Sequence, residues 1–135
     1  MAVSDLGELL KKMKPKLFEG TYYFASVDSS NLMELANYLD DITGIFRENE
    51  GLTIVFSGKI KDDILQITEK DIIGPFALIT LSVESDLMAI GFLAKITEAL
   101  AKEKISVNAF SAYHHDHIFV PFERKDDAMK ALMRL

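Results

Sequence analysis

"FALITLSVESDLMAIGFLAKITEALAKEKISVNAFSAYHHDHIFVP", residues 76–121, is the stretch that decides the fold. Its first part, residues 76–83, is apolar and rich in β-branched side chains, which is typical of a buried strand. Apolar residues then recur at helical spacing between residues 89 and 104, so a helix with one packed face is predicted there. Two further strands, residues 105–113 and 117–121, are joined across a cluster of three histidines. Residues 123–135 then close the chain as a predicted helix, with Ala128, Leu132 and Leu135 at i, i+4 and i+7. The order is therefore strand, helix, hairpin and helix.

The first half of the chain repeats this order. "SVDSSNLM" at residues 26–33 matches "SVESDLM" at residues 82–88, apart from one extra residue. A strand-like run precedes the first copy at residues 21–27. A helical pattern, the hairpin "GIFRENEGLTIVF", residues 44–56, and the weakly helical "KIKDDILQI", residues 59–67, follow it. The match in letters coincides with the match in element order, which indicates an internal repeat.

Strand, helix, hairpin and helix make up most of the βαββαβ ferredoxin-like plan. We therefore predict an α+β fold of two ferredoxin-like units, with antiparallel sheets packed side by side and helices on one face. The expected units are residues 1–72, which include an N-terminal helix, and residues 73–135. Each unit lacks a fourth strand. Residues 66–73 or the strand from Phe76 could complete the first, while the segment around Leu17, the other unit or another copy of the chain could complete the second.

Composition narrows the classes of function. The 135 residues are 49% hydrophobic, enough for a real core, and their formal net charge of -6 disfavours nucleic acid as a partner. No cysteine is present, which excludes disulfides and thiolate nucleophiles. No apolar run approaches the roughly 18 residues of a membrane span, so we expect no membrane insertion and a cytoplasmic location. Phosphate-binding glycine loops and the nucleophile elbow are also missing, and no catalytic residue is nominated.

Three blocks resemble a small bacterial and archaeal family of tandem ACT domain proteins. They are "FRENEGLTIVF", "LSVESDLMAIGFLAKITEALAKEKISVNAF" and "YHHDHIFVP". The resemblance extends from about Pro15 to Leu135, and its most specific part is residues 85–121. More distantly, the second half is similar to the ACT units of aspartokinases and of eukaryotic cytosolic arginine sensors. The resemblance implies a regulatory fold that binds a small molecule, usually an amino acid, without catalysis or a cofactor.

The strand-to-helix turn "SDLMAIG" is the candidate ligand site. Free backbone N–H groups at the start of a helix attract an anion such as an α-carboxylate. Gly91, placed in the first turn of the predicted helix, costs about 1 kcal/mol relative to alanine. Either close approach by a ligand or tight packing of the helix on its sheet would explain that glycine. In ACT units the ligand commonly lies at this turn and against a neighbouring strand, so the resemblance nominates Ser85, Asp86, Leu87, Met88, Ala89, Ile90, Gly91, Asn108 and Phe110.

The cluster His114, His115, Asp116 and His117 allows several interpretations. Alternation along a strand would place His115 and His117 on one face, with His114 and Asp116 on the other. Two ligands on a face are too few for a tetrahedral metal, and no other histidine exists, so we expect no metal site. Asp116 could accept hydrogen bonds from backbone N–H groups of its own turn. By resemblance to the arginine sensors, Asp116 could instead meet the ammonium or basic end of an amino acid.

The sequence therefore predicts a regulatory protein that senses an amino acid at the interface of its ACT units. Leu35 and Ala36 stand where the first unit would need its glycine, so one site per chain, built by the second unit, is expected. We also expect a homodimer. The alternative is a ligand-free dimerisation or interaction module.

Overall fold

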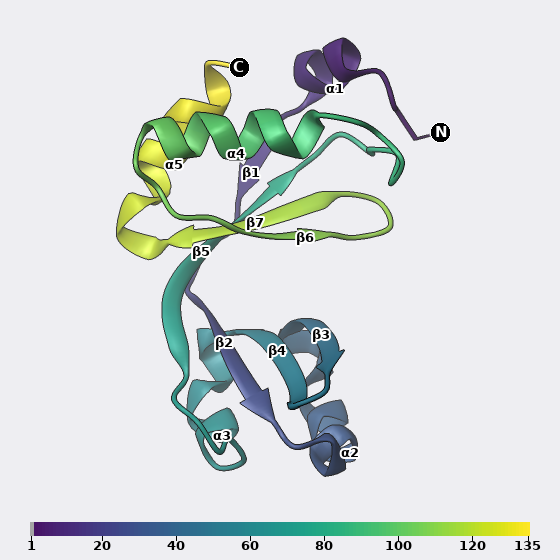
Figure 1. Cartoon of the computed structure of the whole chain (residues 1–135). Helices are drawn as coiled ribbons and strands as arrows, with labels where there is room; N and C mark the ends of the chain where they lie inside the picture. The colour runs from purple at the N-terminus through teal and green to yellow at the C-terminus, as the bar shows by residue number, and fades with distance from the viewer. Residues whose placement is uncertain (1) are drawn as a thin grey trace. The chain divides into compact units, whose positions relative to one another are not determined.

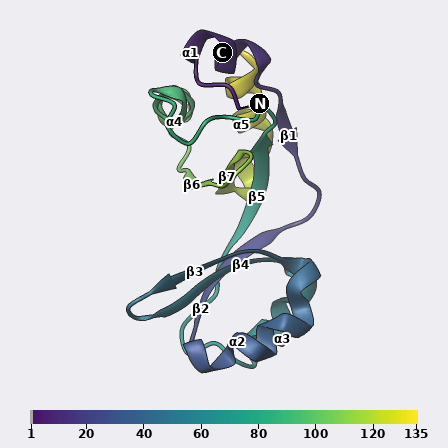
Figure 2. The same ribbon diagram turned by 90° about the vertical axis from the view of Figure 1, so that its right-hand side faces the viewer.

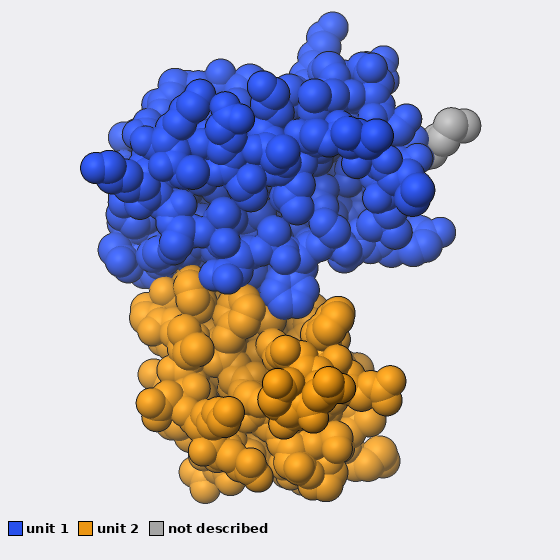
Figure 3. Space-filling model, viewed as in Figure 1, with its two compact units in different colours: residues 1–19, 77–135 blue, residues 20–76 orange. Residues whose placement is uncertain are grey.

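The computed structural model describes residues 2–135, which form two compact units (Figures 1 and 3). Unit 2 is Gly20–Phe76, and unit 1 combines the chain up to Glu19 with Ala77–Leu135. This division differs from the expected one at residues 72 and 73, because the N-terminal segment belongs with the second half of the chain. Within the described residues, no helix has the length and apolar character needed to cross a membrane.

Unit 2 is a complete βαββαβ unit. Its elements are β2 (Tyr22–Val27), a 3₁₀ turn (Ser29–Asn31), α2 (Leu32–Leu35), a 3₁₀ segment (Ala36–Asp41), β3 (Ile42–Glu48), β4 (Gly51–Ser57), a 3₁₀ turn (Gly58–Ile60), α3 (Lys61–Leu65) and the start of β5 (Ile73–Leu81). The strand order is β3-β4-β2-β5, and the three pairings between these neighbours are antiparallel. The fourth strand is thus supplied by β5, in which Ile73 pairs with Phe24 and Phe76 with Tyr22. Helices α2 and α3 lie on one side of these strands (Figure 2).

Alternating residues of the strands form the core of unit 2. Ala25 and Val27 of β2 face the same side as Leu52, Ile54 and Phe56 of β4 and pack with the helical segments. Leu52, Ile54 and Phe56 alternate along β4, so they share one face of the strand.

Unit 1 contains the same plan with its fourth strand placed first in the chain. Its elements are α1 (Leu6–Lys12), β1 (Pro15–Leu17), the second part of β5, α4 (Phe92–Lys102), β6 (Asn108–Ser111), β7 (Asp116–Pro121), a 3₁₀ turn (Phe122–Arg124) and α5 (Lys125–Met133). The strands follow the order β1, β5, β7, β6. β1 pairs antiparallel with β5, with Leu17 opposite Ile79. Of the three alternatives for completing this sheet, the N-terminal segment is the correct one.

The core of unit 1 explains why the N-terminal segment belongs there. Leu9 of α1 and Met13 are buried among Ile96 of α4, Leu132 of α5 and Ile79 of β5. α4 and α5 lie on one side of β5, β6 and β7 (Figure 1). The predicted α+β class, with two ferredoxin-like units, is confirmed.

Two helix boundaries differ from the prediction. α4 begins at Phe92 rather than at Ala89, so Ile90 lies outside the helix and is exposed. α5 buries Ala128 and Leu132 as predicted, but it ends at Met133, and Leu135 lies beyond it and is partly exposed.

Candidate functional site

A pocket of about 190 Å³ lies in unit 1 where the chain passes from β5 to α4. All of its lining residues belong to unit 1, and they come from the β5–α4 segment, the first turn of α4 and the β6–β7 hairpin. They are Ser85, Asp86, Leu87, Ala89, Phe92, Leu93, Ser111 and Asp116. Polar groups thus converge with apolar ones, which is the usual composition of a small-molecule site.

A buried pair, Ser85 and Asp116, forms the polar part of the pocket. Ser85 is 6% exposed and Asp116 is 7% exposed. The Ser85 hydroxyl donates a hydrogen bond of 2.8 Å to Oδ2 of Asp116. Within the described chain no other donor reaches this carboxylate. The expectation that Asp116 accepts from backbone N–H groups of its own turn is therefore wrong, because the side chain is directed to a segment 31 residues away.

The N-terminus of α4 adjoins the same pocket through Phe92 and Leu93. Gly91 is the N-cap residue, and no side chain caps the helix. The first-turn N–H groups consequently have no side-chain acceptor in the described structure, which makes this helix end able to attract an anion.

Gly91 itself has a conformational explanation. Its φ of +90° lies in the left-handed region, which side chains other than glycine rarely adopt. A Cβ at this position would meet only Leu6 Cδ2, at 3.4 Å. Neither of the two expected reasons for the glycine, ligand approach or tight packing on the sheet, is needed. The spacing of apolar residues predicts helix at this position. That spacing gives no information about the positive φ of Gly91, which ends the helix here.

The segment before Gly91 is an ordered turn with apolar side chains on its surface. The Asp86 carboxylate accepts from the Met88 N–H at 2.8 Å, and the Asp86 carbonyl accepts from the Ala89 N–H at 2.9 Å. Leu87, Met88 and Ile90 are 61%, 83% and 86% exposed. Of these three only Leu87 lines the pocket.

The pocket thus contains Ser85, Asp86, Leu87, Ala89 and Asp116 from the nominated residues. Met88, Ile90, Gly91, Asn108 and Phe110 do not line it. Phe110 packs against Phe119 instead, with ring centroids 5.8 Å apart.

Sequence reasoning missed three lining residues, Phe92, Leu93 and Ser111. Ser111 is opposite Asp116 in the β6–β7 pairing. The hairpin register, had it been predicted, would have identified Ser111 as a neighbour of the nominated Asp116.

The three histidines make polar contacts with the segment between β5 and α4. Nδ1 of His114 donates to Oε1 of Glu84 at 2.8 Å, and Nδ1 of His115 donates to the Val83 carbonyl at 3.2 Å. Nδ1 of His117 and the Thr80 hydroxyl are 2.8 Å apart. The rings of His115 and His117 meet edge to face, with centroids 6.3 Å apart. Among residues 2–135, no three His, Asp or Glu side chains are arranged to hold a metal ion.

Two groups near the pocket have shifted pKa values. Burial lowers the pKa of His117, the nearby His115 lowers it further, and Asp116 acts in the opposite direction. The hydrogen bond from His114 lowers the pKa of Glu84, against a smaller opposing effect of desolvation.

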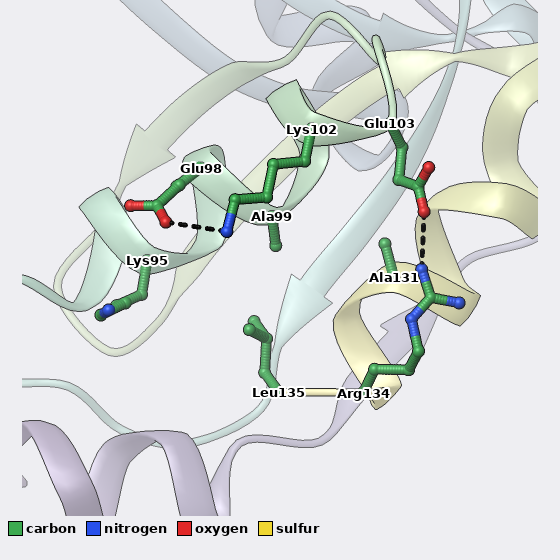
Figure 4. Close-up of a pocket in the computed structure, with 8 residues that line it drawn as sticks. All are labelled: Lys95, Glu98, Ala99, Lys102, Glu103, Ala131, Arg134 and Leu135. Atoms are coloured by element: carbon green, nitrogen blue, oxygen red, sulfur yellow. Dashed lines mark hydrogen bonds and ion pairs between the residues drawn. The ribbon is translucent and has the colours of Figure 1, made fainter.

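Two larger hollows lack a buried charged group. A groove of about 270 Å³ between α4 and α5 is lined by exposed charges that pair with each other, Lys102 with Glu98 at 3.2 Å and Arg134 with Glu103 at 2.7 Å (Figure 4). A hollow of about 330 Å³ lies over β2 within unit 2. The smaller pocket is therefore the candidate site, because it contains the buried, hydrogen-bonded pair Ser85 and Asp116.

Comparison with known proteins gives matches in both halves of the chain. One ACT domain family model matches residues 75–134, and a second ACT domain model matches residues 1–60. No curated protein sequence matches the chain.

Solved structures give further matches. A Vibrio cholerae protein of unknown function, described as a "possible transport protein", is 36% identical, with a TM-score of 0.78 over 93% of this chain and 91% of that one. A protein from Agrobacterium tumefaciens is 16% identical, with a TM-score of 0.70 and coverages of 91% and 88%. The regulatory subunit of aspartate kinase from Thermus thermophilus is 11% identical, with a TM-score of 0.65 and coverages of 90% and 96%. The last two share the fold alone.

Proposed function

Because this chain belongs to the ACT domain family and contains two such units in tandem, we propose that it is a regulatory protein that binds an amino acid in the pocket at the start of α4. The family and the fold shared with a regulatory subunit of aspartate kinase support the regulatory, ligand-binding part of this proposal. The amino acid and the particular pocket rest on the geometry of unit 1.

The observation that carries the proposal is the buried carboxylate of Asp116 in a pocket without a cationic side chain. A buried carboxylate is costly unless a donor or a positive charge compensates it, and Ser85 supplies one neutral donor. The ammonium group of an amino acid would provide that compensation. Its α-carboxylate would find the uncapped N-terminus of α4, a helix of 11 residues.

The size of the pocket agrees with a small metabolite. Sites for drug-sized ligands occupy roughly 300–1,000 Å³, whereas this pocket has about 190 Å³. Leu87, Ala89 and Phe92 provide an apolar wall for a side chain or a short aliphatic portion of the ligand.

The test is thermal unfolding of the whole chain against each of the twenty amino acids at millimolar concentration. A ligand at 100 times its Kd stabilises by about 2.7 kcal/mol, which in a protein of this size raises the Tm by roughly 8 °C. We expect such a shift for one amino acid or a few chemically related ones. A flat panel at all concentrations would contradict the proposal.

A pair of isosteric variants locates the site. Asp116→Asn removes the buried charge and should abolish the ligand-induced shift. Asp28→Asn is the matched control, because Asp28 is an exposed carboxylate in unit 2 that caps a 3₁₀ turn through Ser30. If both variants respond to the ligand like the parent chain, the amino acid binds elsewhere.

A second candidate function, a ligand-free interaction module, is favoured by the exposed side chains of Leu87, Met88 and Ile90. Contiguous exposed apolar side chains mark interaction surfaces, and a second copy of this chain is the partner we propose. Sedimentation velocity checks it: Met88→Glu should shift a dimer to monomers. A flat amino-acid panel together with such a dimer would favour this alternative.

The cytoplasmic location stays a prediction, which cell fractionation checks.

A further inference from the structure

We propose that the histidine-bearing end of the β6–β7 hairpin is a proton-sensitive latch, in which His114, His115 and His117 are positioning residues for the segment that carries the ligand pocket. The inference rests on the pocket proposed above and adds a means of regulating it. In the latch, His114 and His115 of the turn and Asp116 and His117 at the start of β7 each contact one residue of β5 or of the segment that follows it, residues 82–86.

Four side-chain contacts join the hairpin to β5 and to the segment after it. His117 contacts Thr80 at 2.8 Å, His115 contacts Val83 at 3.2 Å, His114 contacts Glu84 at 2.8 Å, and Asp116 contacts Ser85 at 2.8 Å. Thr80 is in β5, and the other three partners lie in the segment that leads to the pocket. The hairpin therefore fixes the segment at three points, of which Ser85 belongs to the pocket itself, and contacts β5 at a fourth.

The other side of the segment is held by backbone pairing alone. The Val3 N–H donates to the Glu84 carbonyl at 2.8 Å, and the Asp86 N–H donates to the Val3 carbonyl at 2.8 Å. Those bonds contain no titratable group. Besides the histidines, the N-terminal amino group also titrates near the physiological range and contributes to lowering the pKa of Glu84.

The charged groups around the latch are few. Glu84 and Asp86 are on the facing segment, and Asp116 is the first residue of β7. Tyr113 packs on the His114 ring with centroids 4.9 Å apart. On β1, Lys16 is opposite Thr80, and its ammonium lies 4.8 Å from the centroid of the Phe18 ring. β6 contributes uncharged residues, Asn108–Ser111.

Protonation weakens this arrangement. The ring centroids of His114 and His115, and of His115 and His117, are each 6.3 Å apart, so charging all three rings creates mutual repulsion. His117 is also half-buried, which disfavours its charged form. The His114–Glu84 pair gains from protonation, and its exposure limits that gain. Asp116 also favours the charged form of His117, but less than burial and His115 disfavour it. The latch therefore loosens as the pH falls, and Ser85 and Asp86 lose their support.

The chain is well suited to a direct test, because all three of its histidines are in the latch. Histidine is the side chain whose ordinary pKa lies between pH 5 and 8. The measurement is hydrogen–deuterium exchange of the ligand-free protein at pH 7.5 and pH 5.5, corrected for intrinsic exchange rates. We expect protection of residues 82–91 to fall by about three- to tenfold at the lower pH, in line with unscreened repulsion at this separation. Protection of β4 in unit 2 should stay unchanged.

Matched variants assign the response. His117→Gln keeps an amide able to hydrogen-bond Thr80 but cannot be charged, so most of the pH response should disappear. His114→Gln removes one of the two close ring pairs but keeps the half-buried His117, so it should reduce the response less than His117→Gln does. A pH-independent segment in the parent chain, or an undiminished response in His117→Gln, would overturn the latch.

A measurement on the parent chain guards against a variant that fails to fold. In an NMR titration, the Ser85 amide shift and the His117 ring shift should have the same midpoint, and different midpoints would overturn the latch. Neither readout requires a ligand. An unresponsive amino-acid panel with an intact latch would therefore refute only the proposed function, whereas a responsive panel with a rigid segment would refute only the latch.

Discussion

Ser85 and Asp116 show at the scale of single residues how the pocket depends on one hydrogen bond. Replacing Ser85 by alanine leaves the buried Asp116 carboxylate without its donor, which should lower the free energy of unfolding by about 1–3 kcal/mol. Ser111→Ala is the control, because Ser111 lines the same pocket but is exposed and has no side-chain hydrogen bond in the described structure. Urea denaturation measures both. Equal effects of the two substitutions would show that the bond does not matter.

The sequence allowed Ser85 and Asp116 to be nominated separately, but not as a pair. Ser85 was nominated through the strand-to-helix turn, and Asp116 through its acidic character beside the histidines. Their contact spans 31 residues and depends on how β7 aligns beside β5. No local periodicity contains that alignment, so the bond and the contacts of the three histidines could not be predicted.

His117 gives the stability of the chain a defined dependence on pH. Burial lowers its pKa below the ordinary 6.5 in the folded state, so the unfolded chain binds more protons in the interval between the two values. Stability is therefore fully present above pH 6.5 and declines as the pH falls through that interval. Denaturation at pH 7.5 and pH 5.5 should show this loss, and His117→Gln should reduce it.

The Glu84 carboxyl acts in a separate range. Its pKa is lowered from 4.5 by His114, so any contribution is lost only at more acidic pH, below the histidine interval. A loss of stability confined to pH values below 4.5 would contradict the assignment to His117.

At the scale of elements, α4 shows where a correct helix prediction ended. The apolar spacing of Ile96 and Leu100 identified the helix, and both are buried. The same spacing extended the prediction to Ile90. The positive φ of Gly91, however, keeps the helix from reaching back to Ile90. A hydrophobic pattern records which residues are apolar, and in the turn before α4 those residues face solvent.

The boundary of α4 leads to a contrast between two isoleucines. Ile96→Ala should cost about 2–5 kcal/mol, because Ile96 is fully buried in the core of unit 1. Ile90→Ala should change the stability by less than about 0.5 kcal/mol, because this side chain is exposed and outside the helix. Chemical denaturation compares them. A comparable loss in both variants would place Ile90 in a packed position.

At the scale of the whole molecule, the two units share one plan but differ in the order of their strands along the chain. Unit 2 contains its four strands in sequence, whereas unit 1 takes its fourth strand, β1, from the segment before unit 2. The internal repeat predicted two ferredoxin-like units, and this was correct. It left open which segment completes unit 1, because the pairing of β1 is decided by which open edge of a sheet it meets.

This organisation makes a prediction about truncation. Removing residues 1–19 takes away β1, which covers the edge of β5, and Leu9 and Met13, which are buried in the core of unit 1. Unit 1 should therefore lose protection against hydrogen exchange in β7, while β4 in unit 2 keeps its protection, because its hydrophobic core contains no residue of the removed segment. Leu9→Ala should act in the same direction with a smaller effect, since it leaves β1 in place. If the truncation exposed β4 and left β7 protected, residues 1–19 would belong to the first unit, as the sequence had suggested, and the origin of the fourth strand in unit 1 would have to be sought in another copy of the chain.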